Sequence, residues 1–152
     1  MEQETVLELF DRYSDTVYRI ALGYLRSPWG AEDAVQAVFL KLLERDVTLY
    51  PGKERAFLAK ITVNHCKDVL RQARHYADTP LEELALLAPA EDREVFRAVM
   101  ELPEKYRSVV LLHCLEGYSL QEIAETLQIG SSAVSMRLHR ARNILKQQLG
   151  RE

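Results

Sequence analysis

The chain has 152 residues, enough for one ordinary domain or two small ones, and 47% of them are hydrophobic and 28% charged. Its six glycines and five prolines are too few for a β architecture with many turns. No apolar stretch is long enough to cross a bilayer, and the acidic start of the chain lacks the layout of a signal peptide. Two isolated cysteines, Cys66 and Cys114, suit a reducing compartment. We expect a mostly helical, soluble and cytoplasmic protein with no membrane insertion.

The net charge of −3 hides an uneven distribution of charged residues. Residues 53–74 contain six basic and two acidic side chains, whereas residues 76–104 contain two basic and eight acidic ones. Residues 105–152 contain seven basic and four acidic side chains. Because clustered charge sets the local field, both basic zones are candidates for binding a polyanion despite the acidic total.

The first half of the chain predicts three helices. Apolar residues recur every three or four positions over residues 6–25, and this helix should end near Ser27-Pro28, because a residue before proline avoids the helical conformation. Pro51-Gly52 separates the second helix from the third. The stripe expected to be buried in the second helix comprises Ala31, Ala34, Val35, Val38, Phe39, Leu42 and Leu43. Residues 1–76 should therefore form a small helical bundle.

The helical pattern is lost in the acidic middle of the chain. We interpret residues 77–92 as a linker that contains one short helix at Leu81–Leu87. Helical spacing returns from Val95, and Pro103 suits the first turn of the next helix. That helix is expected to bury Val109, Leu112 and Leu115.

The C-terminal segment predicts a helix-turn-helix. Ser119 and Glu122 fit a capping box at the start of a short helix, and the chain breaks at Gln128-Ile129-Gly130. Ser131 and Ser132 can cap a longer helix after the break. That helix should bury Val134, Leu138, Ala141, Leu145 and Leu149. The expected fold is all-α, with two small bundles joined by a linker and the helix-turn-helix within residues 93–152.

The other side of the longer helix suits the DNA major groove. Arginine can bind guanine or a phosphate, and small hydroxyl side chains allow close approach. The residues expected there are Ser131, Ser132, Ser135, Met136, Arg137, His139, Arg140 and Asn143. An ordinary amphipathic helix with a solvated basic face is the alternative interpretation.

A second basic stripe lies in the third helix of the first bundle. Lys60, Asn64, Lys67, Arg71 and Arg74 are spaced by four, three, four and three residues, which places them on one face of a continuous helix. Four basic side chains and an amide fit a nucleic-acid backbone, and the amide is able to hydrogen-bond the edge of a nucleobase. Such a stripe is also typical of the solvent-exposed face of an ordinary amphipathic helix.

Taken together, these segments resemble bacterial sigma factors. Residues 31–40, AEDAVQAVFL, resemble the polymerase-binding motif of that family, and residues 57–71, FLAKITVNHCKDVLR, resemble its −10-reading helix. Residues 102–107, LPEKYR, and residues 119–149 are similar to its −35-reading domain, with RLHRAR at residues 137–142 especially characteristic. The motifs occur in order, with a short linker and no intervening domain. This is the layout of the extracytoplasmic-function (ECF) group.

The resemblance implies a promoter-specificity subunit of RNA polymerase. Its partners would be core RNA polymerase and promoter DNA, with an anti-sigma factor as a further candidate. The polymerase contacts that the family implies are Asp33, Gln36, Val38 and Phe39. The first bundle would hold the −10 element, with Asn64 near a flipped base, and residues 131–143 would enter the −35 major groove. A polymerase-independent helix-turn-helix regulator and a pure protein-interaction module are the alternative functions.

Four residues, at three places in the chain, depart from the family pattern. Gln128 stands where the family usually has glycine, Ser135-Met136 stands where it often has a basic residue and a serine, and Phe57 replaces a frequent tryptophan. The sequence contains no glycine-rich phosphate loop and no convincing catalytic set, so we expect neither an enzyme nor a cofactor. His113-Cys114, being adjacent on a helix, would make a poor metal pair, so we expect no metal site.

Overall fold

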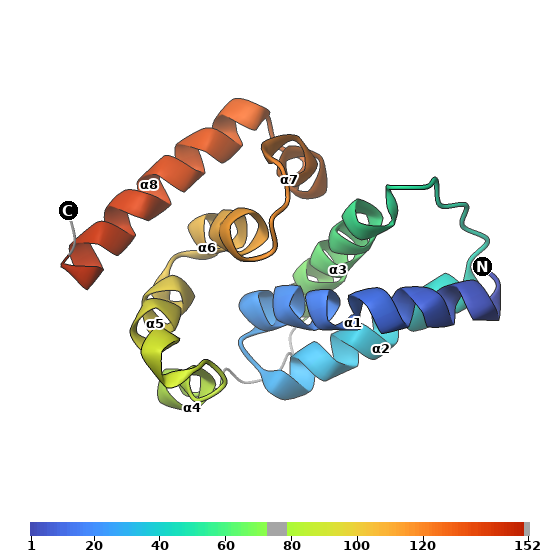
Figure 1. The fold of residues 1–152 in the computed structure, drawn as a ribbon, viewed down its shortest axis with the longest axis horizontal. Coiled ribbons are helices and arrows are strands. Elements are labelled where there is room, and N and C mark those ends of the chain that lie inside the picture. The colour runs from blue at the N-terminus through green and yellow to red at the C-terminus, as the bar shows by residue number, and fades with distance from the viewer. Residues whose placement is uncertain (73–78, 151–152) are drawn as a thin grey trace. The chain divides into compact units, whose positions relative to one another are not determined.

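The computed structural model describes residues 1–72 and 79–150, and all regular elements within these residues are helical (Figure 1). The chain divides into two compact units, Met1–Ala77 and Asp78–Glu152. The all-α fold expected from the sequence is confirmed. None of the described helices is long and apolar enough to cross a membrane.

The first unit consists of three helices, of which α1 and α2 pack side by side in an antiparallel arrangement (Figure 1). Their bounds are α1 Gln3–Leu25, α2 Pro28–Glu44 and α3 Glu54–Arg71. Helix α1 ends as predicted, with Arg26 in a left-handed conformation at φ 55°. The Ser27 side chain accepts a hydrogen bond from the Gly30 backbone N–H at 3.1 Å, and Pro28 is suited to the first helical position since it has no N–H to satisfy.

A tight turn directly precedes the third helix, at the end of the segment that follows α2. The Lys53 N–H donates to the Tyr50 carbonyl oxygen at 3.0 Å, and Gly52 adopts φ 83° between them. Proline followed by a glycine with positive φ is typical of a type II turn. The chain break predicted at Pro51-Gly52 is therefore confirmed.

The core of the first unit is formed by all three of its helices. The buried cluster comprises Val6, Leu9, Val17, Val38, Phe39, Leu42 and Leu58. The Phe39 ring meets the Phe10 ring edge to face, with centroids 5.1 Å apart. Leu43, which the sequence pattern placed in the buried stripe of α2, is instead exposed.

The second unit is built from shorter helices. Their bounds are α4 Leu81–Ala85, η1 Ala90–Asp92, α5 Arg93–Glu101, α6 Glu104–Val110, η2 Leu111–Leu115, α7 Leu120–Leu127 and α8 Ser131–Leu149. Much of the segment interpreted as a linker packs within this unit. Leu84 and Ala85 are fully buried, and the Arg97 guanidinium on α5 binds the Glu82 carboxylate at 2.9 Å.

A π-helical turn, η2, directly follows α6 and precedes the segment that leads to α7. The Glu116 N–H donates to the Leu111 carbonyl oxygen, and the Tyr118 N–H donates to that of Leu112. The His113 ring Nδ1 lies 3.0 Å from the Tyr118 carbonyl oxygen, so the ring donates there. Leu115 was expected in the core, but the widened turn leaves it 63% exposed.

The helix-turn-helix is present at α7 and α8. Ser119 and Glu122 form both hydrogen bonds of the predicted capping box, at 3.1 and 2.9 Å. Gln128 ends α7 in the left-handed conformation with φ 57°, where a non-glycine residue is strained by roughly 1–2 kcal/mol. The prediction that Ser131 or Ser132 caps α8 is wrong, since Gly130 occupies the N-cap position and Ser131 is already helical.

The core position of Phe39 leads to a testable contrast with its neighbour Leu40. We expect Phe39→Ala to lower the free energy of unfolding by about 3–5 kcal/mol, because it leaves a cavity among packed side chains. Leu40→Ala, on the same helix but 53% exposed, should change it by less than about 0.5 kcal/mol. Urea denaturation followed by circular dichroism measures both. Equal losses would contradict the burial of Phe39.

Candidate nucleic-acid interface and docking surface

Helix α8 presents a polar face opposite a buried stripe. Val134, Leu138 and Ala141 are buried, and α8 packs on α5, α6 and α7. The residues predicted for DNA contact that are exposed are Ser131, Ser132, Ser135, Met136, His139, Arg140 and Asn143, while Arg137 is half-buried. The structure thus brings the eight predicted residues onto the first three and a half turns of one helix.

Two side chains of this face are held by neighbours. The Arg140 guanidinium hydrogen-bonds the Tyr106 hydroxyl of α6, and this bond, with the nearby Lys105 and Arg140 charges, lowers the pKa of the Tyr106 phenol. The Lys105 Nζ lies 5.1 Å from the centre of the Tyr106 ring. Asn143 Nδ2 is 3.4 Å from His139 Nε2, one turn away. Arg140 and His139 are therefore partly oriented before any ligand arrives.

Helix α3 presents the second predicted stripe. Lys60, Asn64 and Arg71 are exposed and Lys67 is half-buried, whereas the fifth predicted residue, Arg74, lies outside the described residues. The Arg71 guanidinium makes a 2.7 Å ion pair with Asp68, and both side chains are well exposed. Such a pair contributes little to stability, so Arg71 is able to exchange its carboxylate for a phosphate.

Asn64 borders a cavity of about 210 Å³ in the first unit. The wall residues are Lys41, Leu42, Arg45, Val47, Phe57, Ile61, Asn64, His65 and Asp68. The wall combines an aromatic ring, aliphatic side chains, an amide, an imidazole, two cations and one carboxylate. This composition fits a planar polar ring attached to a phosphate backbone.

The surroundings of the histidine on this wall lower the pKa of its imidazole. Burial lowers the pKa of the His65 imidazole below its ordinary value, and the Lys41 ammonium lowers it further. The Asp68 carboxylate acts in the opposite direction. The positively charged form of the ring is therefore disfavoured in the cavity.

Helix α2 places only half of its predicted contact residues at the surface. Asp33 and Gln36 are exposed, but Val38 and Phe39 are 1% and 5% exposed and pack in the core. Sequence reasoning missed Leu40 and Leu43, which are 53% and 44% exposed and share a helix face with Asp33 and Gln36. The positions 33, 36, 40 and 43 follow helical spacing, and that spacing is the signal that could have identified them.

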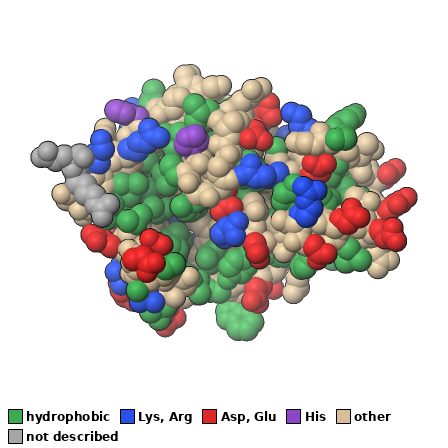
Figure 2. All heavy atoms as spheres, in the orientation of Figure 1, with side chains coloured by type: hydrophobic (Ala, Val, Ile, Leu, Met, Phe, Trp, Pro, Cys, Tyr) green, Lys and Arg blue, Asp and Glu red, His purple; other side chains and the backbone are tan. Residues whose placement is uncertain are grey.

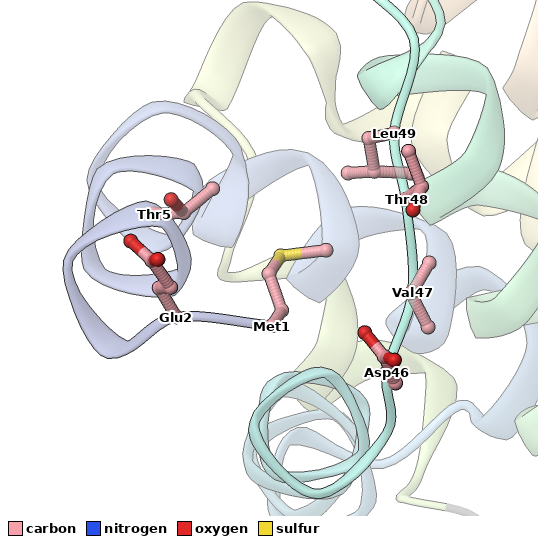
Figure 3. Close-up of a pocket in the computed structure, with 7 residues that line it drawn as sticks. All are labelled: Met1, Glu2, Thr5, Asp46, Val47, Thr48 and Leu49. Carbon is pink, nitrogen blue, oxygen red and sulfur yellow. The ribbon is translucent and has the colours of Figure 1, made fainter.

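An open hollow of about 470 Å³ lies between the start of α1 and the segment that follows α2 (Figure 3). It is lined by Met1, Glu2, Thr5, Asp46, Val47, Thr48 and Leu49. The Met1 ammonium group donates to the Arg45 carbonyl oxygen at 2.6 Å. Acidic side chains gather over this end of α1 (Figure 2), where Glu2, Glu4 and Glu8 are exposed. The negative charge there is unsuited to a DNA contact.

Comparison with known families gives two matches along the chain. Residues 9–76 match sigma-70 region 2, and residues 92–145 match sigma-70 region 4. An ECF RNA polymerase sigma factor, SigM of Mycobacterium tuberculosis, is 32% identical over 152 residues, which cover 94% of this chain and 76% of SigM. The chain belongs to the ECF group of the sigma-70 family.

Other relatives of this ECF sigma factor cover different shares of their own length. SigW of Bacillus subtilis is 27% identical over 97% of this chain and 90% of SigW. SigE of Mycolicibacterium smegmatis is 29% identical over 95% of this chain, which spans only 61% of SigE.

Two solved structures share the fold. The sigma factor RpoE of Bartonella quintana, solved in complex with the anti-sigma factor NepR, has a TM-score of 0.73 at 18% identity, with 98% of both chains covered. CnrH, solved in complex with the cytosolic domain of CnrY, has a TM-score of 0.72 at 25% identity, with 98% of this chain and 90% of CnrH covered.

The charges around His65 predict opposite responses to two substitutions in this ECF sigma factor. We expect Lys41→Met to raise the pKa of His65, because it removes a nearby positive charge, and Asp68→Asn to lower it. Titration of the imidazole signals by NMR measures both shifts. Shifts in the same direction for the two variants would contradict the arrangement of the cavity wall.

Proposed function

We propose that this ECF sigma factor binds core RNA polymerase through α2 and directs it to promoters that it reads with α3 and α8. The observation that carries the DNA assignment is the outward face of α8, where serine, histidine, arginine and asparagine side chains are exposed at helical spacing. The second helix of a helix-turn-helix enters the major groove with residues near its N-terminus. The protein acts by binding rather than by catalysis, in the cytoplasm where polymerase and promoter are found.

The polymerase would contact the exposed face of α2, formed by Asp33, Gln36, Leu40 and Leu43. Two exposed leucines beside polar groups are typical of a protein interface, in which apolar side chains supply the buried area and polar ones fix the orientation. Val38 and Phe39 support this surface from the core instead of contacting the partner.

The −10 element would lie along α3. Lys60, Lys67 and Arg71 would bind phosphates, and Asn64 would bond the edge of a base turned into the adjoining cavity. Turning a base out of the stack costs a few kcal/mol, and the ring of Phe57 and the amide of Asn64 would offset part of this cost.

We propose an anti-sigma factor as a third partner. RpoE and CnrH, which share this fold, were each solved with a second protein bound. The second unit contains an apolar cavity of about 400 Å³ whose wall includes Val95, Phe96, Val99, Leu111 and Leu115. Such a wall suits the apolar side chains of a protein partner.

The α2 assignment predicts the effect of one substitution on polymerase binding. We expect Leu40→Ala to weaken binding to core polymerase about tenfold, since the loss of a central apolar contact costs about 1–2 kcal/mol. Leu7→Ala, which removes an equally exposed leucine from α1, should change the affinity less than twofold. Titration of fluorescent core polymerase measures both. Tight DNA binding with no polymerase binding would favour a polymerase-independent regulator.

The two reading helices predict separable losses of promoter specificity. Arg140→Ala should relax selection in the −35 element by roughly 1–3 kcal/mol, because the arginine would bond a base edge there in a bidentate manner. Asn64→Ala should instead relax selection at one −10 position. Scoring a randomised promoter library with each holoenzyme tests this prediction. Loss of the same bases in both variants would contradict the assignment of two sites.

A further inference from the structure

The outward face of α8 contains one apolar side chain that has no role in the polar DNA contacts proposed for this face. Met136 is 52% exposed, and it is the one exposed large hydrophobic residue of α8, a helix that the structure describes in full. The residues around it on this face are polar: Ser132, Ser135, His139 and Arg140 are all exposed. An apolar group in the middle of this face is suited to an apolar partner on the DNA.

The helical spacing of α8 places the Met136 side chain on the side of the helix that faces away from the core. It lies two residues after Val134 and two before Leu138, both of which are buried. Since each residue of an α-helix advances by about 100°, Met136 is about 160° away from each of them. It is also the sixth residue of α8, within the part of a recognition helix that reaches base edges.

Small neighbours allow this side chain to reach the floor of the groove. Ser132 lies one turn before Met136 and Ser135 lies beside it, so the side chains next to Met136 on its N-terminal side are small. Methionine has three flexible side-chain torsions and a polarisable sulfur, which let it adapt to a shallow apolar surface. In the major groove the thymine 5-methyl group is the apolar feature that distinguishes one base pair from the others.

We propose that Met136 selects thymine in the −35 element by contacting its 5-methyl group. The inference rests on the proposed function of α8 and adds a base preference to it. Met136 and Arg140 are separated by four residues, or about 6 Å along the helix axis. Base pairs are about 3.4 Å apart, so the thymine should lie within two base pairs of the position that Arg140 reads.

Replacing thymine with uracil removes only the methyl group and therefore isolates this contact. The −35 sequence is first obtained by selection with the wild-type holoenzyme, and each thymine on both strands is then replaced with deoxyuridine. We expect wild-type affinity to fall about fourfold at one position, the factor that corresponds to burial of one methyl group. With Met136→Ala, the thymine and uracil duplexes should bind equally.

The matched control is Leu86→Ala, which removes another exposed apolar side chain of the same unit, outside α8 and outside the apolar cavity of this unit. This variant should keep the wild-type ratio between thymine and uracil duplexes. Thermal unfolding should be unchanged by Met136→Ala, because the side chain is exposed.

Four results would overturn the inference. The inference would be overturned, with the proposed function left standing, if no thymine of the selected −35 element were sensitive to replacement with uracil. The same conclusion would follow if Met136→Ala kept the wild-type ratio of affinities for thymine and uracil duplexes. Weaker binding of Met136→Ala to core polymerase without DNA would assign the side chain to a protein contact instead. Failure of the holoenzyme to select any sequence would overturn the proposed function, and the inference with it.

Discussion

The rotation of each functional helix about its own axis is set by the side chains that it buries. In the second unit, Val134, Leu138 and Ala141 dock α8 on its neighbours, and this fixes which residues face outwards. A rotation by one residue would bury Ser135 and His139 and expose apolar area, at a cost of about 25 cal/mol for each Å². In the first unit, Val38, Phe39 and Leu42 determine the outward face of α2 in the same way. The surfaces proposed for binding in both units thus depend on core packing.

Local signals in the sequence predicted most helix boundaries. Ser27-Pro28 at the start of α2, Pro51-Gly52 before α3 and the capping box of α7 each involve residues close together in the chain. Their hydrogen bonds and steric limits act within a few residues, so the structure confirms them without reference to distant contacts. The residues of the outward face of α8 could also be predicted from the sequence, because helical spacing alone assigns residues to a face.

The errors arose where distant packing decides the outcome. The pattern of α2 contains adjacent apolar pairs, and only contact with α1 and α3 determines that Leu42 is buried while Leu43 is exposed. The resemblance to sigma factors suggested Val38 and Phe39 as partner contacts, although both are core residues here. Leu115 became exposed because η2 adds a residue to its turn, and helical spacing does not anticipate such a turn. The Tyr106–Arg140 contact joins two helices and has no local signal in the sequence.

The ion pair between Arg71 and Asp68 has a consequence for how salt should affect DNA binding. A basic side chain that binds a phosphate normally releases a condensed cation from the DNA, and this release makes affinity fall steeply with salt. Arg71 already has a tethered anion 2.7 Å away, so it must part from Asp68 when it binds a phosphate. The carboxylate then stays close to the duplex and retains a cation that would otherwise be released. In the proposed complex, the contact made by Arg71 would therefore be less sensitive to ionic strength than that of Lys60, because Asp68 would act as a counterion built into α3.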